Sequence, residues 1–488
     1  MKISEILNSV NVIQVIGNPE KVEVKAISNN SNEIEEGYVF VAIKGMKKDG
    51  HEFIPEAISK KAAAIILEDD KLPDEIFLQS NCVKILVKNS RKAFAQFATA
   101  LYSDPSAKLN LIGITGTKGK TTTAFMIKQI LDFSGNECGL LGTIANYIGK
   151  DEIPAKLTTP ETNVINEFLG KMVERGSKAC VMEVSSHSLE LYRTEGLKFS
   201  VAVFTNITSD HFDFHKTFES YLSAKKKLFD QLSESANIVY NLDDLNSGKL
   251  LSNSKAKKYS YGMNPDADFV ISDIRYDLNG TAFKIKSKLF EEDFTIPLIG
   301  VFNAYNAAAA IITSFVFGIK IEIIKEAIAK VKQVPGRFEV IKNKKKTVIV
   351  DYSHTTDSLR QALQAVHHLT KGEKIYCVFG CGGDRDKLKR PEMGEAAAEL
   401  SDFVFVTSDN PRDEEPMSII NDIITGIKKS NYAIEEKREE AIRRAICESE
   451  ENAVILIAGK GHENYQEIHG IRKYFSDRET AIKYLERC

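Results

Sequence analysis

Residues 109–122 decide the fold of this chain, and they read Leu109-Asn-Leu-Ile-Gly-Ile-Thr-Gly-Thr-Lys-Gly-Lys-Thr-Thr122. An apolar run over 109–115 predicts a buried strand, and the helical spacing over 122–133 predicts a helix. The glycine loop between them, 116–121, is typical of a phosphate cradle, because glycines let backbone amides converge and a helix N-terminus offers unpaired N–H groups. The segment therefore predicts phosphate binding on a parallel α/β sheet.

The loop residues have distinct expected roles. Lys120 is expected to meet the β- and γ-phosphates of a nucleotide, and a threonine hydroxyl to bind Mg²⁺. Ile114 stands five residues before Gly119, where the usual P-loop has glycine, so this loop is shorter. GTPase, kinase and ligase all remain open at this point. The predicted nucleotide-binding residues of the loop are Gly116, Thr117, Lys118, Gly119, Lys120, Thr121 and Thr122.

Three stretches carry their own alternation of strand and helix patterns, which predicts an α/β fold of three domains. Residues 1–106 predict a small α/β domain. Residues 107–336 predict a central P-loop ATPase-like domain with a parallel sheet, in which the alternation over 266–299 indicates antiparallel strands. After the linker Val334-Pro-Gly-Arg337, residues 337–488 predict a Rossmann-like domain that lacks the G-x-G-x-x-G fingerprint.

The composition excludes several classes of protein. The 488 residues are 43% hydrophobic and 27% charged with a net charge of −3, which excludes a disordered or coiled-coil chain and gives no support to a general nucleic-acid binder. There is no run of about 18 apolar residues to span a membrane, and the first residues are not typical of a signal peptide. The seven cysteines are expected to be free core thiols in a reducing cytosol. Cys377-x3-Cys381 lacks the second pair that a structural zinc site needs.

Polar side chains follow two apolar runs of the central domain. Glu183 is expected at the carboxyl edge of the sheet, where ligands bind in such folds, and its carboxylate suits Mg²⁺. His211 and His215, spaced i,i+4 with Asp213 between them, also raise the alternative of zinc. No third His or Cys ligand and no H-E-x-x-H pattern accompanies them, and the loop with Lys120 favours magnesium and nucleotide.

The short loop resembles that of the Mur ligase and folylpolyglutamate synthetase superfamily, and the resemblance extends over almost the whole chain. The further motifs that carry it are Met182-Glu-Val-Ser-Ser-His-Ser188, Gly336-Arg-Phe338, Asp351-Tyr-Ser-His354 and Asp409-Asn-Pro-Arg412. The family usually has asparagine at the position of Lys118 and proline at that of Thr356.

The resemblance implies roles for single residues, and among these the role of Lys225 could not have been singled out from the sequence alone. The implied magnesium ligands are Thr121, Glu183, His211 and a carbamylated Lys225, and the implied catalytic residues are Lys120, Lys225 and His211. By itself the run Lys225-Lys-Lys227 is typical of a solvated helix face. Carbamylation needs a neutral amine, and the neighbouring ammonium groups of Lys226 and Lys227 are expected to disfavour the cation.

The resemblance also implies three groups of binding residues. The nucleotide group continues with Asn303, Arg337, Asp351 and His354. The group for the UDP-sugar peptide is Ser31, Thr158, Thr159, Ser185 and Arg193. The amino-acid group is Arg385, Asp409, Asn410, Pro411, Arg412, Gly459 and Glu463. Without the family, Asn303 would be the N-cap of a helix expected over 303–317.

The activity that the resemblance implies is the ATP-dependent addition of meso-2,6-diaminopimelate to UDP-MurNAc-L-Ala-D-Glu through an acyl phosphate, in peptidoglycan precursor synthesis. The expected protein is a cytoplasmic monomer that binds these two substrates and ATP with Mg²⁺, but no nucleic acid or membrane. Arg412 favours diaminopimelate over L-lysine, because a guanidinium fork pairs with the additional carboxylate. The alternatives are L-lysine addition, a ligase like folylpolyglutamate synthetase, and a non-catalytic nucleotide switch.

Overall fold

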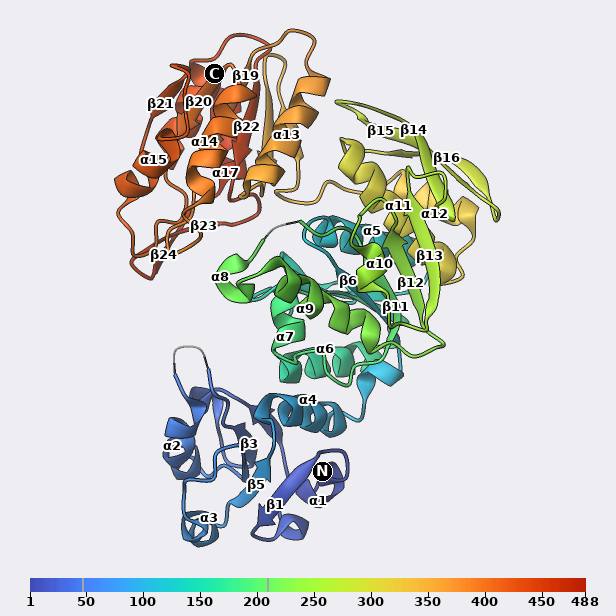
Figure 1. Cartoon of the computed structure of the whole chain (residues 1–488), viewed down its shortest axis with the longest axis vertical. Coiled ribbons are helices and arrows are strands. Elements are labelled where there is room, and N and C mark those ends of the chain that lie inside the picture. The colour runs from blue at the N-terminus through green and yellow to red at the C-terminus, as the bar shows by residue number, and fades with distance from the viewer. Residues whose placement is uncertain (46–47, 209) are drawn as a thin grey trace. The chain divides into compact units, whose positions relative to one another are not determined.

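The computed structural model describes residues 1–45, 48–208 and 210–488, without the side chains of Phe212 and Asp213. The chain divides into two compact units. The first holds Met1–Asn206, Leu222–Tyr259 and Val316–Ile319, and the second holds Ile207–Tyr221, Ser260–Phe315 and Lys320–Cys488. Both units combine helices with sheets, which confirms the predicted α/β fold class (Figure 1). The three domain boundaries stay a prediction.

The N-terminal part of the first unit is built around a five-stranded sheet with the strand order β1-β5-β4-β3-β2. Its strands are β1 (Val12–Ile16), β2 (Ala26–Ser28), β3 (Tyr38–Val41), β4 (Ala64–Leu67) and β5 (Val83–Val87). Its helices are α1 (Ile3–Leu7), α2 (Ile54–Ser59), α3 (Asp74–Gln79) and α4 (Ser90–Leu101), with 3₁₀ turns at Pro19–Lys21, Ser31–Glu33, Gly50–Phe53 and Pro105–Ala107. β1 is antiparallel to β5 and the other neighbours are parallel. Apolar clusters cover both faces of this sheet, so β4 is buried along its whole length.

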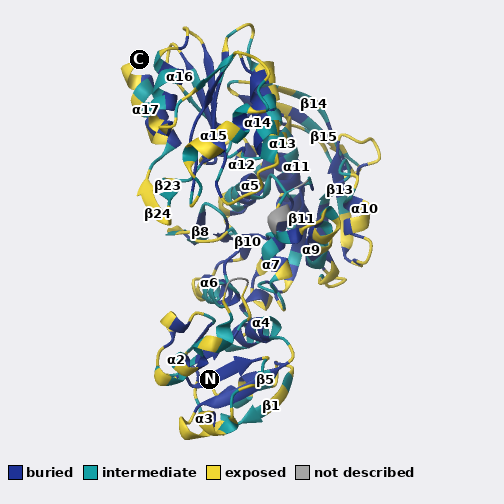
Figure 2. Ribbon diagram, turned by 60° about the vertical axis from the view of Figure 1, so that its left-hand side comes forward, coloured by how far each residue is buried: buried dark blue, intermediate teal, exposed yellow. Residues whose placement is uncertain are grey.

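A second sheet in the first unit has β6 at its centre, within the strand order β12-β11-β6-β10-β7-β8-β9. Its strands are β6 (Asn110–Thr115), β7 (Cys138–Leu141), β8 (Ala145–Ile148), β9 (Asp151–Pro154), β10 (Ala179–Glu183), β11 (Phe199–Phe204) and β12 (Asn237–Asn241). The helices are α5 (Lys120–Phe133), α6 (Thr162–Glu174), α7 (Ser186–Glu190), α9 (Phe218–Asp230) and α10 (Ser247–Leu250). The strands from β12 to β7 are parallel, so their carboxyl ends meet at one edge. Figure 2 shows β10 and β11 as buried.

The second unit contains an antiparallel meander, which the alternation over 266–299 predicts correctly. The elements of this part are α8 (Phe212–His215), β13 (Lys257–Gly262), β14 (Phe269–Asp277), β15 (Gly280–Ser287), β16 (Glu291–Ile296), α11 (Val301–Val316) and α12 (Ile321–Ile328). Because α11 begins at Val301, Asn303 lies inside its first turn and is not an N-cap. The Asn303 side chain instead donates from Nδ2 to the carbonyl of Ile299 at 2.9 Å.

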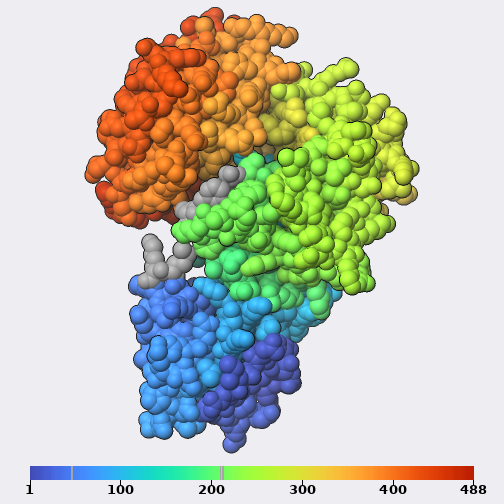
Figure 3. Space-filling model, viewed as in Figure 1, coloured from blue at the N-terminus to red at the C-terminus, as the bar shows by residue number. Residues whose placement is uncertain are grey.

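The rest of the second unit is a six-stranded sheet with the order β17-β18-β22-β19-β20-β21, in which only β17 is antiparallel to its neighbour. Its strands are β17 (Glu339–Lys342), β18 (Thr347–Asp351), β19 (Ile375–Phe379), β20 (Phe403–Val406), β21 (Tyr432–Ile434) and β22 (Val454–Ala458), followed by the hairpin β23 (Tyr465–Ile468) and β24 (Ile471–Tyr474). Its helices are α13 (Thr356–Leu369), α14 (Lys389–Glu399), α15 (Pro416–Ile424), α16 (Arg438–Cys447) and α17 (Asp477–Arg487). Helices α13–α15 cover one face and α16 and α17 the other, which is the predicted Rossmann-like arrangement. The space-filling view shows the outer face of this part (Figure 3, orange to red).

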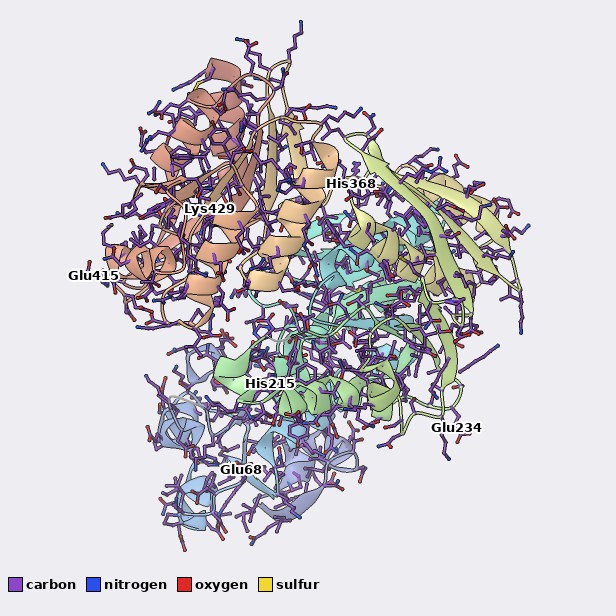
Figure 4. The ribbon with its side chains drawn as sticks, turned by 45° about the horizontal axis from the view of Figure 1, so that its top comes forward. Glu68, His215, Glu234, His368, Glu415 and Lys429 are labelled. Atoms are coloured by element: carbon purple, nitrogen blue, oxygen red, sulfur yellow. A yellow bond between two sulfur atoms is a disulfide. The ribbon has the colours of Figure 1, made fainter. Side chains whose placement is uncertain are left out.

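Strand β14 also contacts α13 within the second unit. The rings of Tyr276 and His368 lie 4.3 Å apart between centroids, and Figure 4 labels His368 on its helix. Leu278 and Phe302 pack against the same apolar cluster. The antiparallel meander and the C-terminal sheet therefore share part of one core.

The cysteines differ partly from the expectation. Five are buried and free, namely Cys82, Cys138, Cys180, Cys377 and Cys381. Cys447 and Cys488 instead form a disulfide, with Cα atoms 5.3 Å apart, so the expectation of free thiols is wrong for this pair. The two residues come together because Cys447 ends α16 and Cys488 follows α17, and both helices cover the same face of the sheet. Among the described residues no helix is long and apolar enough to cross a membrane.

Candidate active site

The glycine loop joins β6 to α5, as the sequence predicts (Figure 1). Gly116 has φ +152° and Gly119 has φ +85°, and L side chains rarely adopt such positive values. A Cβ at position 116 would lie 2.0 Å from Oγ1 of Thr205, so no larger residue fits there. Helix α5 begins at Lys120 with Gly119 as its N-cap, and the N-terminus of a helix is a favourable place for a phosphate group.

The end of β11 anchors the loop. The N–H groups of Thr117 and Lys118 donate to the backbone carbonyl and to Oδ1 of Asn206, at 2.8 and 3.0 Å. The carbonyl of Lys118 accepts from Oγ1 of Thr205 at 2.6 Å and from Nδ2 of Asn206 at 3.1 Å. These bonds use the backbone of Lys118, so they do not depend on the side chain that departs from the family pattern. Sequence reasoning assigned no role to Asn206.

Two lysines converge on the same loop carbonyl. Nζ of Lys120 donates to the carbonyls of Gly116 and Thr117, at 2.7 and 3.0 Å. Nζ of Lys225 donates to the carbonyl of Gly116 at 2.8 Å. Lys225 is 1% exposed, so the interpretation of this position as a solvated helix face is wrong. The structure thus brings together the two lysines to which the family resemblance gives catalytic roles.

The neighbours of Lys225 do not act as the sequence suggested. Lys226 forms an ion pair with Asp230, and Nζ of Lys227 lies 2.7 Å from Oε2 of Glu190. Because each of these ammonium groups is paired with a carboxylate, Lys226 and Lys227 disfavour a positive charge on Lys225 less than two unpaired ammonium groups would.

Glu183 ends β10 with its side chain completely buried. Its Oε2 accepts from Oγ1 of Thr121 at 2.8 Å and from Oγ1 of Thr143 at 2.9 Å, and its Oε1 accepts from N of Thr143 at 2.8 Å. A Cβ at Gly142 would lie 2.5 Å from Oε1. Sequence reasoning missed Thr143, although it follows β7 at the same carboxyl edge of the sheet, and that position was the available signal.

The residues expected to hold the UDP-sugar peptide form a second polar cluster beside Glu183. Oγ1 of Thr159 donates to the carbonyl of Glu183 at 2.8 Å and accepts from N of Ser185 at 3.0 Å. Oγ1 of Thr143 lies 3.1 Å from Oγ1 of Thr158. Arg193 donates to the carbonyl of Thr159 at 3.1 Å, and its guanidinium pairs with Glu161 at 2.6 Å.

Ser31, assigned to the same substrate, lies in the N-terminal sheet domain, in the 3₁₀ turn Ser31–Glu33. Its hydroxyl donates to Oε2 of Glu56 at 3.1 Å, and its carbonyl accepts from Nζ of Lys60 at 2.8 Å. No direct bond links Ser31 to the cluster around Thr159 among the described hydrogen bonds.

Three residues assigned to the nucleotide gather around Tyr352 in the second unit. The Arg337 guanidinium lies 4.4 Å from the centroid of the Tyr352 ring. Nδ1 of His354 lies 2.8 Å from the carbonyl of Tyr352, and burial lowers the pKa of His354 below its usual value. Oδ1 of Asp351 accepts from N of Phe338 at 2.7 Å. Asn303, by contrast, uses its side chain within its own helix, where its Oδ1 accepts from Asn306 at 3.2 Å.

The amino-acid group assembles at the carboxyl ends of β20 and β22. Nδ2 of Asn410 donates to Oε2 of Glu463 at 2.8 Å. Gly459 has φ +118°, and a Cβ there would lie 2.5 Å from Oδ2 of Asp409. Nζ of Lys460, which sequence reasoning left without a role, lies within 3.5 Å of Asp409, Asn410 and Glu463.

Arg412 lies close to this group in a left-handed conformation, with φ +52°. Its Nη1 donates to the carbonyl of Gly383 at 2.6 Å, and its backbone N–H donates to the carbonyl of Glu467 at 3.0 Å. Pro411 is buried, and its carbonyl packs so closely on Gly383 that a Cβ there would lie 1.9 Å away. Arg385 lies on an exposed stretch before α14.

The alternative of zinc rested on three neighbouring residues. His215 is buried, with its ring 5.3 Å from that of Tyr221, and Figure 4 labels it on α8. The side chain of Asp213 lies outside those described. Among the described residues no group of three or more His, Cys, Asp or Glu side chains could hold a metal. His211 belongs to the second unit, and its role at a second Mg²⁺ stays a prediction.

A cavity of about 550 Å³ lies at the other end of the parallel strands, beside the first residues of β6 and β10. Lys108, Asn110 and Lys178 are among its lining residues. Ligands of open parallel sheets bind at the carboxyl ends of the strands, so the cluster around Glu183 is the stronger candidate site.

Comparison with known proteins gives three family matches. The model described as Mur ligase family, catalytic domain, matches residues 23–102. Mur ligase middle domain matches 114–314, and Mur ligase, glutamate ligase domain, matches 336–461.

Two relatives match along their whole length. Both are named UDP-N-acetylmuramoyl-L-alanyl-D-glutamate–2,6-diaminopimelate ligase. The protein of Clostridium perfringens is 44% identical over 97% of this chain and 97% of its own. That of Bacteroides fragilis is 41% identical over 98% of both chains.

Solved structures agree with these matches. A structure of a ligase with the same name has a TM-score of 0.71 and 30% identity, and the match covers 100% of this chain and 99% of that one. A Mycobacterium tuberculosis folylpolyglutamate synthase complexed with ADP and AMPPCP has a TM-score of 0.62 and 17% identity over 74% of this chain and 91% of that one, a likeness of fold alone. With family matches in all three parts and full-length relatives above 40% identity, the chain belongs to the Mur ligase family.

Proposed function

We propose that this chain is an ATP-dependent ligase that adds meso-diaminopimelate to UDP-MurNAc-L-Ala-D-Glu in cytoplasmic peptidoglycan precursor synthesis. The observation that carries the proposal is the buried carboxylate of Glu183, bonded to Thr121 of the glycine loop. It stands in a chain whose whole length matches relatives that are named for this activity.

The reaction has two steps. The terminal carboxylate of the D-glutamyl residue attacks the γ-phosphorus of ATP, which forms an acyl phosphate and releases ADP. The amine of diaminopimelate then attacks the acyl carbon and loses a proton, and phosphate leaves as the amide forms. When ATP binds, Nζ of Lys120 would leave the carbonyls of Gly116 and Thr117 and donate to the phosphates instead. Its charge and the first N–H groups of α5 would then stabilise the negative charge that develops on the phosphoryl group.

Thr121 and Glu183 fit a magnesium site. Their hydrogen-bonded oxygens lie 2.8 Å apart, and hydroxyl and carboxylate oxygens are the ligands that Mg²⁺ prefers. Thr143 holds the Glu183 carboxylate in place with two hydrogen bonds. Bound Mg²⁺ would neutralise charge on the phosphoryl oxygens. The family resemblance also proposes His211 and Lys225, each by itself, as ligands of magnesium.

Lys225 is proposed to act as a carbamate. Its burial supports this, because burial disfavours the charged form of an amine, and carbamylation needs the neutral form. A carbamate keeps one N–H group on Nζ, so the hydrogen bond to the carbonyl of Gly116 can persist while two oxygens are added.

The remaining substrates are assigned to the flanking domains. We propose residues 1–106 as the UDP-binding domain, 107–336 as the ATP-binding domain and 337–488 as the amino-acid-binding domain of a monomer. Ser31 and the cluster of Thr158, Thr159, Ser185 and Arg193 would hold the UDP-sugar peptide. In the amino-acid domain, Arg412 keeps one guanidinium nitrogen on the carbonyl of Gly383, and the rest of the fork is suited to the distal carboxylate of diaminopimelate.

Turnover with combinations of substrates tests the proposal. Phosphate should be released only when ATP, UDP-MurNAc-L-Ala-D-Glu and an amino acid are all present, with diaminopimelate preferred over L-lysine at equal concentration. Preferential ligation of lysine would support the alternative substrate. Glutamate addition to a folate would favour the folylpolyglutamate synthetase alternative, and nucleotide binding without any ligation would favour a switch.

A further inference from the structure

A lysine outside the assigned groups lies at the centre of the C-terminal carboxylate cluster. Lys460 follows β22 and is completely buried. Its Nζ lies 2.9 Å from Oδ1 of Asn410. The same Nζ lies 3.5 Å from Oδ1 of Asp409 and 3.4 Å from Oε2 of Glu463. The buried ammonium group of Lys460 is therefore a shared partner of the Asn410 amide and of the two carboxylates.

The cation fixes the orientation of the Asn410 amide. Oδ1 of Asn410 accepts from Nζ of Lys460 and from N of Glu467, which lies at 3.0 Å. Nδ2 of Asn410 donates to Oε2 of Glu463 at 2.8 Å. Because the amide oxygen faces two donors and the amide nitrogen faces an acceptor, only one orientation satisfies all three bonds.

The charges of the cluster do not cancel. Asp409 and Glu463 bring two negative charges and Lys460 one positive charge, which leaves one negative charge in excess. Arg438 adds none, because Asp477 pairs with it at 2.7 Å and both side chains are completely buried.

The other ionisable groups around the cluster leave this excess in place. Burial raises the pKa values of Tyr352 and Tyr465 above their usual value, so both rings are neutral near pH 7. Glu467 pairs with Arg472 at 3.2 Å. Arg412 and Arg337 are further cations close by. The proposed function assigns Arg412 to the distal carboxylate of the substrate, and Arg337, whose guanidinium lies over the Tyr352 ring, to the nucleotide.

We propose that Lys460 is a positioning residue of the amino-acid subsite, which orients Asn410 and leaves Glu463 as the surplus negative charge that receives the distal ammonium group of the incoming amino acid. This inference rests on the proposed ligase function. Diaminopimelate and lysine both carry a distal ammonium, so Lys460 serves either amino acid, whereas Arg412 distinguishes between them.

The test begins with Lys460→Met, which keeps the length of the side chain and removes its charge. Without the cation, Oδ1 of Asn410 loses one of its two donors, and the carboxylates of Asp409 and Glu463 lose the positive charge that they share. Relative to the wild type, KM for diaminopimelate should rise by about tenfold at pH 7, because the Asn410 amide that bonds to Glu463 is no longer fixed in one orientation. KM for ATP should stay within about twofold.

A second substitution separates charge from structure. Asp409→Asn in the Lys460→Met background removes one carboxylate and restores the single excess negative charge. The double variant should therefore have a lower KM for diaminopimelate than Lys460→Met, without reaching the wild-type value, because Asp409 itself belongs to the amino-acid group. A purely structural role for Lys460 predicts the opposite, since a second change in the same cluster would worsen KM.

Two results would overturn the inference: a folded Lys460→Met variant with wild-type KM at pH 7, or a double variant no better than the single one. If Lys460→Met does not fold, Lys460→Gln provides the same comparisons, because it keeps an N–H donor without the charge. Failure of the proposed function is distinguishable, because the wild-type protein would then release no phosphate with any amino acid.

Discussion

Replacing Glu183 by glutamine tests the proposed magnesium site most directly. The substitution keeps the shape of the side chain, and Oε1 can still accept from N of Thr143. The hydroxyls of Thr121 and Thr143 can rotate to accept from the new amide nitrogen. We therefore expect Glu183→Gln to fold while it loses the charge that the metal needs.

The magnitude follows from the three hydrogen bonds of this carboxylate. A hydrogen bond to a charged group contributes about 1.5–3 kcal/mol and a neutral one about 0.5–1.5 kcal/mol, so weakening three of them costs about 3 kcal/mol. Relief from burying a charge offsets part of this cost, and we expect the free energy of unfolding to fall by about 1–3 kcal/mol. The kcat should fall by about 10²-fold or more, because the charge acts on the transition state.

The assay is phosphate release with all substrates present, measured over a series of Mg²⁺ concentrations, with urea unfolding as the check on folding. Glu167→Gln is the matched control, because Glu167 forms an exposed i,i+4 pair with Lys171, which is worth only about 0.3–0.5 kcal/mol. If Glu183→Gln keeps both the kcat and the magnesium dependence of the wild type, Glu183 is not a metal ligand and the assignment is wrong.

Three further predictions concern other parts of the chain. Lys225→Ala should abolish ligation, and short carboxylic acids should restore part of it, whereas the control Lys226→Ala should have only a mild effect. Native mass spectrometry should find an added CO₂ on the wild-type protein. Full activity of Lys225→Ala would contradict the carbamate. Arg412→Ala should lower kcat/KM for diaminopimelate by a factor that corresponds to about 2–5 kcal/mol and change KM for ATP little, and an equal loss for lysine would refute the pairing with the distal carboxylate. The Arg390 guanidinium lowers the pKa of Glu414 to about 2, from a usual value near 4.5, so the pair stabilises the fold above about pH 4.5 and this contribution is lost as the pH falls toward 2. Glu414→Gln should therefore lower stability at pH 7 more than at pH 2, and equal losses at both pH values in urea unfolding would contradict it.

Local patterns predicted most of the regular structure. The strand, loop and helix over 109–133 are confirmed as β6, the glycine loop and α5. They were predictable because an apolar run and a glycine turn are each formed by residues that are neighbours in the sequence. The pattern failed for short or mixed elements, such as β21 (Tyr432–Ile434) and the hairpin of β23 and β24, whose residues are mostly half-exposed or exposed and give no apolar run.

The site was predictable only in part. Lys120 and Thr121 lie within one contiguous motif, and Glu183 follows an apolar run, so their chemistry is visible along the chain. Thr143 and Lys460 are not visible in this way, because each acquires its role from partners about 40–50 residues away, at the ends of other strands. The family resemblance, and not the residue pattern, singled out Lys225.

The sequence by itself determined where the strands, helices and glycine turns lie, since apolar periodicity and backbone freedom depend on neighbouring residues. The order of the strands was decided only by the tertiary structure, because β6 lies between β11 and β10 through pairings that no local pattern encodes. That order brings Thr121 to Glu183 across 62 residues and Lys225 to Gly116 across 109. The same holds for Lys460, whose charge can be buried only because β20 and β22 end at the same edge of the C-terminal sheet, where two carboxylates and an amide offset the cost of removing an ammonium from water.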